Sequence, residues 1–244
     1  MTSLKPALVT GGSRGIGRAV ALRLASDGRP ILVGYAGGRD AAESVVAEIV
    51  AAGGKAAAVQ ADISDPVQVN RLFGESESRF GELGIVVHSA GIMALSPIAP
   101  AHLDEFDKIV ATNLRGAFLV LGEAAARLGT GGRIIALSSS VIARPAPGYG
   151  AYIASKAGVE GLVHVLAQEL RGRGVTVNAV APGPTGTELF LDGKSEEEID
   201  RLVKAPPLER LGEPEDIARA VAFLAGPDGA WVHGQILRVN GGFA

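Results

Sequence analysis

The 244-residue sequence contains no cysteine, which excludes disulfide bonds, thiolate catalysis and cysteine-based metal sites. Its four histidines are scattered and form no HxxxH or HExxH spacing, so we expect no metal site. Runs of lysine or arginine are also missing and the net charge is −3. The usual electrostatic footprint of proteins that bind nucleic acid or anionic membranes is therefore absent.

Long apolar runs are scarce as well. The longest candidate lies around residues 218–225 and ends at Gly226-Pro227, well short of the roughly 18 residues that span a bilayer. The first six residues are too short and too polar for a secretory leader. We therefore expect no membrane association and, given the missing cysteines, a cytoplasmic location.

Short apolar runs alternate with longer helical patterns along the whole chain. Most of the apolar runs are continuous, as expected for strands buried on both faces. The predicted strands are 8–10, 31–35, 56–60, 85–89, 133–137, 175–181 and 235–239, and the predicted helices are 15–27, 40–52, 66–80, 104–128, 152–172 and 214–224. With right-handed crossovers, this alternation predicts an α/β chain with one domain over 1–244, a doubly wound parallel seven-stranded sheet with helices on both faces.

One segment interrupts this alternation. Residues 187–211 follow the sixth predicted strand and are long, charged and interrupted by proline. An insertion at the carboxyl edge of a sheet favours a mobile substrate lid. An ordinary pair of surface helices is the alternative.

A glycine-rich turn joins the first predicted strand to the first predicted helix. Gly11 permits the tight turn, Gly15 lets the backbone approach a pyrophosphate, and Gly17 lets the helix lie close to the sheet. The helix N-terminus then directs N–H groups and its positive dipole end at the phosphates. Such a turn alone is weak evidence, but its place at the start of a βαβ series predicts a dinucleotide site.

The end of the second predicted strand bears on the choice of dinucleotide. Residues 34–39 contain no carboxylate that would accept hydrogen bonds from the free 2′-hydroxyl of NAD(H). Arg14 and Arg39 supply positive charge instead, so NADP(H) is favoured over NAD(H). The alternative is that both arginines are solvated surface residues.

Tyr152 and Lys156 open a long helical pattern, and their four-residue spacing places them on one helix face, about 6 Å apart at Cβ. A tyrosine with a pKa near its ordinary value of about 10 is a poor acid–base catalyst, and a neighbouring ammonium is expected to lower that pKa. Three serines at 138–140 close the fifth predicted strand, and a hydroxyl there can polarise a substrate carbonyl. Asn113 lies inside a helical pattern that asparagine does not favour.

The glycine spacing G-x-x-x-G-x-G resembles that of the short-chain dehydrogenase/reductase family, and the resemblance extends over nearly the whole chain. The stretches 184–190 and 239–242 are similar to the 3-oxoacyl-(acyl carrier protein) reductase-like branch. The resemblance implies a Rossmann-type fold and hydride transfer to a ketone. It assigns Ser139 to polarise the carbonyl, Tyr152 to donate the proton, Lys156 to bind the nicotinamide ribose and Asn113 to hold a relay water. The cofactor contacts it implies are Gly11, Ser13, Arg14, Gly15, Ile16, Gly17, Tyr35, Asp62, Ile63, Ala90, Gly91, Tyr152, Lys156, Pro182, Gly183, Thr185 and Thr187.

The chain departs from the family where Asn-Asn-Ala-Gly is usual, since it has His88-Ser89-Ala90-Gly91. A catalytic His88 is conceivable, but a buried, hydrogen-bonded histidine is the expectation. The expected partner is a small carbonyl or alcohol, because the pocket residues are mostly apolar: Ile92, Met93, Val141, Ile142, Pro145, Tyr149, Pro184, Leu189 and Phe190.

Three questions about ligands and assembly stay open. Arg144 is expected to be solvated, with capture of a substrate anion as the alternative. Arg171 and Arg173 could help to dock an acidic carrier protein, which the glutamates at 196–198 would oppose. The competing functions are an NAD-linked secondary-alcohol or sugar dehydrogenase and a non-catalytic dinucleotide sensor. The resemblance implies a homotetramer or homodimer.

Overall fold

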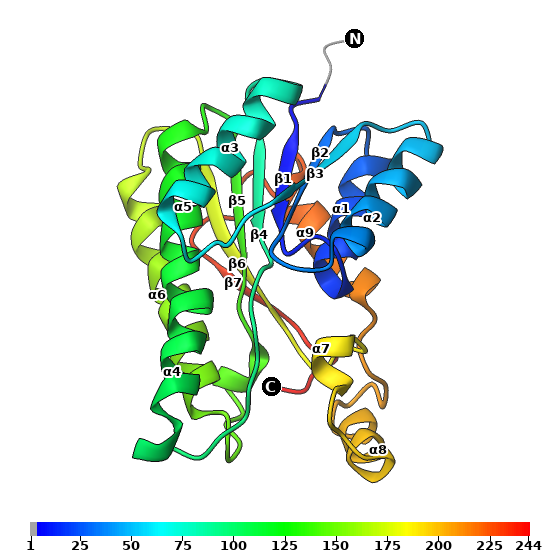
Figure 1. Ribbon diagram of the computed structural model, residues 1–244, viewed down its shortest axis with the longest axis vertical. Helices are drawn as coiled ribbons and strands as arrows, with labels where there is room; N and C mark the ends of the chain where they lie inside the picture. Colours follow the sequence, from blue (N-terminus) through cyan, green and yellow to red (C-terminus); the bar gives the residue numbers. More distant parts are fainter. Residues whose placement is uncertain (1–3) are drawn as a thin grey trace.

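A computed structural model describes residues 4–244, so Met1–Ser3, part of the stretch in which no leader is expected, lie outside the described residues. Seven strands form one sheet in the order β3-β2-β1-β4-β5-β6-β7, and every neighbouring pair is parallel. The predicted doubly wound Rossmann-type sheet is confirmed (Figure 1). Its strands are β1 Ala7–Thr10, β2 Ile31–Tyr35, β3 Ala56–Gln60, β4 Ile85–His88, β5 Arg133–Leu137, β6 Thr176–Pro182 and β7 Ile236–Val239.

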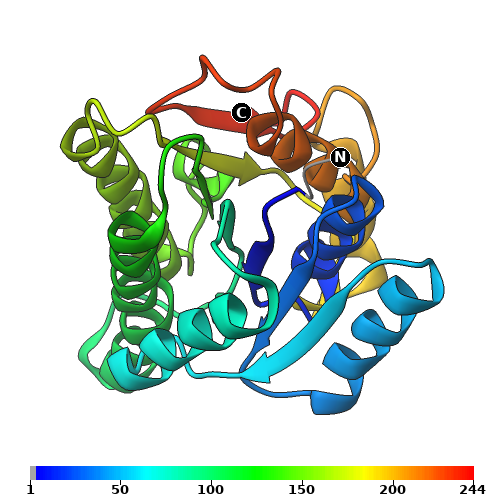
Figure 2. The ribbon, with the colours of Figure 1, turned by 90° about the horizontal axis from the view of Figure 1, so that it is seen from above.

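Helices cover both faces of the sheet, as Figure 2 shows from above. One face carries α1 (Gly15–Ser26), α2 (Arg39–Ala51) and α9 (Pro214–Ala225), and the other carries α3 (Pro66–Phe80), α5 (Gly116–Arg127) and α6 (Gly150–Glu169). Successive strand residues point to opposite faces, so Leu8 packs with the α3–α5–α6 layer while its neighbour Val9 packs with the α1–α2–α9 layer. Continuous apolar strands thus supply two cores.

A capping residue and a proline explain where α3 begins. Asp65 caps α3 by accepting hydrogen bonds from the N–H groups of Val67, at 2.8 Å, and Gln68, at 3.4 Å, and Pro66 occupies the first helical position. The helix α6 begins at Gly150, two residues before its predicted start at Tyr152.

The predicted helix 104–128 is divided in the structure. A short turn at Pro100–His102 leads into α4 (Leu103–Ile109), a π-helical segment at Val110–Arg115, and then α5. The helical run Pro100–Arg127 is long and apolar enough, by length and composition alone, to cross a membrane. Counting consecutive apolar residues overlooked this run, because small and polar residues interrupt the apolar ones without ending the helix. In this fold α5 packs against α3, α6, β4 and β5.

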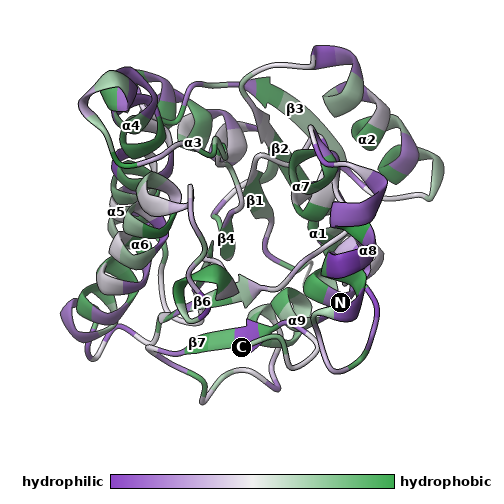
Figure 3. Cartoon of the chain, turned by 90° about the horizontal axis from the view of Figure 1, so that it is seen from below, coloured by the Kyte–Doolittle hydropathy of each residue, from purple (hydrophilic) through white to green (hydrophobic). Residues whose placement is uncertain are grey.

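The segment predicted as a lid, 187–211, lies beyond the carboxyl ends of the strands. It contains α7 (Glu188–Leu191) and α8 (Glu196–Lys204), and neither helix has a fully buried residue. Ser195 begins α8 through a capping box with Glu198. Figure 3, which looks at this edge of the sheet, shows strongly hydrophilic stretches on α8. Movement of this segment stays a prediction.

Candidate active site

A cavity of about 1080 Å³ lies along the carboxyl ends of the strands. This is the edge where open parallel sheets bind ligands. It is lined by every residue that the sequence nominated for cofactor binding, and by Ser139. Asn113 is the exception among the nominated site residues, because it is fully buried behind the wall.

In the glycine-rich loop between β1 and α1, backbone segments pack so closely that two of the glycines leave no room for a side chain. A Cβ at Gly17 would lie 2.1 Å from the carbonyl oxygen of Gly11, and a Cβ at Gly11 would lie 2.7 Å from the backbone of Ala90. Arg14, the N-cap residue of α1, makes no side-chain capping hydrogen bond. The first N–H groups of the helix are therefore not occupied by a capping side chain, and the loop fits the phosphates of a dinucleotide.

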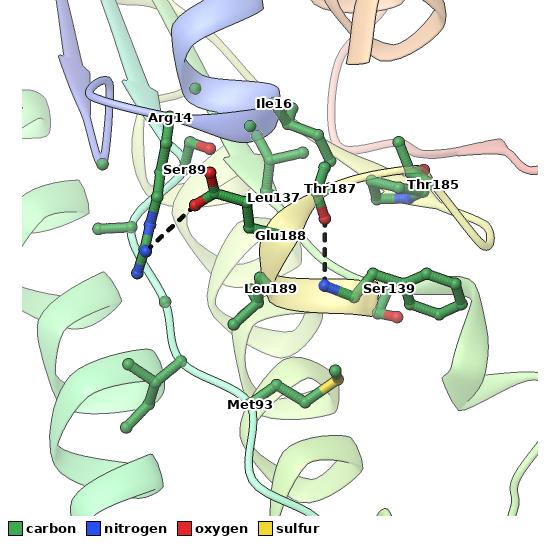
Figure 4. A pocket seen from close by; sticks show the side chains of 18 of the residues that line it. Arg14, Ile16, Ser89, Met93, Leu137, Ser139, Thr185, Thr187, Glu188 and Leu189 are labelled. Atoms are coloured by element: carbon green, nitrogen blue, oxygen red, sulfur yellow. Dashed lines mark hydrogen bonds and ion pairs between the residues drawn. The ribbon is translucent and has the colours of Figure 1, made fainter. Parts of the chain in front are cut away.

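The two arginines invoked for cofactor choice are placed differently. Arg14 lines the cavity and its Nη1 lies 3.6 Å from a carboxylate oxygen of Glu188, at the start of α7 (Figure 4). Arg39 starts α2 but does not line the cavity. Arg18, which the sequence analysis did not consider, lines it and forms an ion pair with Glu48. As expected, the lining residues contributed by the end of β2 and the following turn, 34–38 and Ala41, include no carboxylate.

The residues nominated for chemistry come from β5 and α6. Ser139 follows β5, and its hydroxyl accepts a hydrogen bond of 3.4 Å from the N–H of Val141. Tyr152 and Lys156 lie on the first turns of α6, with the lysine Nζ 5.9 Å from the centroid of the tyrosine ring. The Lys156 Nζ donates a 2.7 Å hydrogen bond to the carbonyl oxygen of Leu137.

Burial has the largest effect on the pKa values of both Tyr152 and Lys156. It raises the pKa of Tyr152 to about 12, against the opposing effect of a hydrogen bond with Ser139. Burial likewise lowers the pKa of Lys156 to about 8. The expectation of a lowered Tyr152 pKa is therefore wrong for this structure, because desolvation of the phenol raises the pKa and Lys156, bonded to a backbone carbonyl, is not among the groups that shift it.

Asn113 lies in the π-helical segment, which explains how a poor helix former is accommodated there. Its amide exchanges two hydrogen bonds with the backbone of Ile92, at 2.8 and 2.9 Å, and donates a third to Ser155 Oγ at 3.2 Å. A Cβ at Gly91 would lie 3.2 Å from the amide oxygen and 3.5 Å from Lys156 Nζ. Asn113 thus ties the strand-end turn to α6 beside the lysine, and its relay role stays a prediction.

His88 is fully buried at the end of β4, as expected for a structural histidine. Its Nδ1 lies 3.0 Å from the Oγ1 of Thr10, which also accepts a 3.4 Å hydrogen bond from the N–H of Ala90. Burial, with a smaller contribution from the charge of Lys156, lowers the pKa of His88 to about 3. The imidazole is neutral at physiological pH and replaces the usual asparagine as a link between β1 and β4.

The substrate part of the cavity differs from the expected pocket at a few positions. Ile142 and Pro145 do not line it, whereas the other seven nominated pocket residues do. The sequence analysis missed Leu202 of α8, Glu215 of α9 and Phe243, which all line the same cavity. Phe243 could have been nominated, because it follows β7, whose carboxyl end lies at the same edge of the sheet.

Comparisons with known proteins agree with this architecture. The family model described as "Enoyl-(Acyl carrier protein) reductase" matches residues 11–244. The chain is 46% identical over 251 residues to an "NADPH-dependent aldehyde reductase-like protein, chloroplastic" of Arabidopsis thaliana, covering 97% of this chain and 93% of the relative. It is 43% identical over 244 residues to a "3-oxoacyl-[acyl-carrier-protein] reductase" of Staphylococcus aureus, with 99% of each chain covered. A solved structure of a short chain dehydrogenase from Burkholderia cenocepacia in complex with NADP is 39% identical, with a TM-score of 0.92 and coverage of 98% of this chain and 97% of that one.

Proposed function

This chain belongs to the short-chain dehydrogenase/reductase family, and we propose that it is an NADP(H)-dependent carbonyl reductase that acts on small aldehydes or ketones. One observation carries the proposal. A single cavity joins the glycine-rich loop, the Ser139 hydroxyl and the Tyr152–Lys156 pair. A dinucleotide bound along the loop and a carbonyl held by the hydroxyl groups would therefore lie in one continuous cavity.

The preference for NADP(H) rests on charge. Arg14 lines the loop, and the lining residues from the end of β2 include no carboxylate that would repel a 2′-phosphate. A relative described as NADPH-dependent and a similar structure that holds NADP support the same choice. Arg39 contributes nothing to the argument, because it does not line the cavity.

When bound, the reduced cofactor supplies a hydride for the carbonyl carbon. Ser139 Oγ donates a hydrogen bond to the carbonyl oxygen as negative charge develops there. Tyr152 gives that oxygen its proton, and the raised pKa keeps the phenol protonated at neutral pH. Lys156 provides a buried cation beside the tyrosine, and Asn113 fixes the turn at Ile92 that borders it. The product is the alcohol, with the hydride on carbon and the tyrosine proton on oxygen.

Small substrates are favoured over acyl groups on a carrier protein. The helix α8 contributes Leu202 to the cavity, and its first turn carries Glu196, Glu197 and Glu198. An acidic carrier protein that approached this side of the mouth would meet like charge. Similarity to a carrier-protein reductase keeps thioesters as the second candidate substrate.

The test is a cofactor-oxidation assay with NADPH and NADH against aldehydes, diketones, β-keto esters, sugars and acyl thioesters on a carrier protein. We expect turnover of small carbonyl compounds and a higher kcat/KM with NADPH. Equal or better rates with NADH would refute the cofactor argument and favour an NAD-linked dehydrogenase. Tight NADPH binding with no turnover of any carbonyl would instead favour a dinucleotide sensor, and turnover of carrier thioesters alone would overturn the choice of small substrates.

A further inference from the structure

The substrate part of the cavity has an apolar wall with an arginine in it. Met93 and Leu189 line the same cavity as Ser139, and Figure 4 labels all three. Besides Lys156, which belongs to the chemistry, the charged residue that lines this part is Arg144. It lies five residues after Ser139, on the loop that connects β5 to α6.

Three carboxylates of the described residues line the cavity, and none of them forms an ion pair with Arg144. They are Asp62, which follows β3, Glu188, which pairs with Arg14, and Glu215, at the start of α9. None of the ion pairs found among residues 4–244 includes Arg144. Its charge is consequently not matched by a carboxylate of the described chain.

Arg144 is nevertheless held in place. Its guanidinium carbon lies 4.6 Å from the centroid of the Phe243 ring, and its Nη1 donates a 3.4 Å hydrogen bond to the Phe243 carbonyl. The segment around Phe243 is itself anchored, because Asn240 Nδ2 donates to Ser140 Oγ at 3.0 Å and that hydroxyl donates to the carbonyl of Ala181 at 2.8 Å. The arginine is thus fixed relative to the strand ends that carry Ser139.

This arrangement leaves one edge of the guanidinium available. The hydrogen bond to the Phe243 carbonyl uses Nη1, so the edge formed by Nε and Nη2 has no hydrogen-bond partner among the described residues. The N–H groups lie in the plane of the guanidinium and can bind a carboxylate with two parallel hydrogen bonds. A freely solvated arginine would have to lose side-chain entropy before it bound an anion, whereas the contacts with Phe243 already restrict Arg144.

We infer that Arg144 is the specificity-determining residue of the substrate pocket and binds the anionic group of the substrate. The substrates are then aldehydes or ketones that carry a carboxylate on an apolar or aromatic body. The apolar wall contacts the body, Ser139 and Tyr152 contact the carbonyl, and Arg144 contacts the carboxylate. The inference rests on the proposed function, because it names the substrate class of that same site.

The experiment compares acids with their neutral esters. The probes are 2-, 3- and 4-carboxybenzaldehyde and the three corresponding methyl formylbenzoates, each reduced with NADPH. The three isomers place the carboxylate at different distances from the aldehyde, so the best of them also reports the separation between Arg144 and the reacting carbon. We expect kcat/KM for at least one acid to exceed that of its ester by about tenfold, mainly through a lower KM. Added salt should reduce this ratio, because Arg144 is exposed to solvent.

Three variants locate the effect. Arg144→Met should bring the acid-to-ester ratio of the preferred isomer to about one or below, and Arg144→Lys should retain part of it, because the charge stays while the planar fork is lost. Phe243→Leu, which keeps the charge but removes the aromatic ring beside the guanidinium, should reduce the ratio partly. Arg171→Met is the matched control, since it removes an exposed arginine beyond the far end of α6.

The outcomes separate this inference from the proposed function. If esters and acids are reduced equally well and the ratio is the same in Arg144→Met, the inference is overturned and the carbonyl reductase stands. An acid preference that survives Arg144→Met, or that Arg171→Met abolishes equally, also overturns it. If NADPH reduces no acid and no ester, the proposed function fails and the inference fails with it.

Discussion

We expect the replacement of His88 by asparagine to change how the stability of the protein depends on pH below neutrality. The folded state holds the imidazole fully buried and lowers its pKa from 6.5 to about 3. The unfolded chain takes up a proton below about pH 6.5 and the folded chain does not, so the free energy of unfolding falls as the pH drops through this window. At pH 5 this one group costs about 2 kcal/mol relative to neutral pH.

The asparagine variant lacks this titration. Between pH 7 and pH 5 the melting temperature of the parent protein should therefore fall by roughly 4 to 8 °C more than that of His88→Asn, because 1 kcal/mol corresponds to roughly 2 to 4 °C for a domain of this size. Denaturant unfolding at the same two pH values gives the free energies directly. His102→Asn, which removes a partly exposed imidazole from the start of α4, controls for the loss of a histidine as such.

Asparagine also changes the packing beside Thr10, so absolute stability is not the readout. The reasoning concerns only the difference between the two pH dependences. Equal losses of stability in the parent and in His88→Asn would refute it. So would an NMR titration in which the His88 ring of the folded protein takes up a proton near pH 6.5.

Three further outcomes follow from the site. Tyr152→Phe should lower kcat for carbonyl reduction by about a hundredfold or more, because the proton donor is lost, while NADPH binding and the circular dichroism spectrum are retained; near-normal turnover would refute the mechanism. The rate of reduction should decline above about pH 8, where Lys156 loses its proton, and Lys156→Arg should move that decline to higher pH; a shared midpoint would exclude the lysine as the titrating group. Gly17→Ala should weaken NADPH binding and lower the melting temperature, because its Cβ would lie 2.1 Å from the Gly11 carbonyl oxygen, whereas Gly122→Ala, with nothing within 4 Å, should not.

Much of the fold could be predicted because both faces of the sheet are covered. Strands buried on two sides appear as continuous apolar runs, and all seven predicted strands agree with the structure to within one residue at each end. The division of 104–128 was not predictable in this way, since α-helical and π-helical turns carry nearly the same apolar periodicity.

The subunit interfaces of the expected homotetramer stay a prediction, although exposed Phe118 and Val165 on α5 and α6 offer apolar surface for them.

The tight turn of the glycine-rich loop was predictable at Gly11 and Gly17 because a side chain at either position would meet nearby backbone, whereas its binding of a cofactor stays a prediction. The packing of Gly17 on Gly11 leaves no room for a side chain at Gly17, and the spacing of glycines in the sequence therefore predicts this contact. The roles of Arg39 and Phe243 were not predictable to the same degree. Whether a surface residue lines a cavity depends on how loops from distant strands fold over the sheet edge, and neither composition nor periodicity encodes that.

The largest difference between expectation and structure concerns the acid of the reaction. A lysine four residues along a helix is near enough to stabilise a phenolate, but the sign of the net effect depends on what else the ammonium bonds and on how much water the phenol loses. Here Lys156 donates to Leu137, and burial raises the pKa of Tyr152 to about 12. A phenol in that state is protonated at neutral pH, although it is a weaker acid than an ordinary tyrosine. The populated state is thus the protonated one that the proposed reduction of a carbonyl would use, whereas oxidation of the alcohol requires that the phenol first lose its proton.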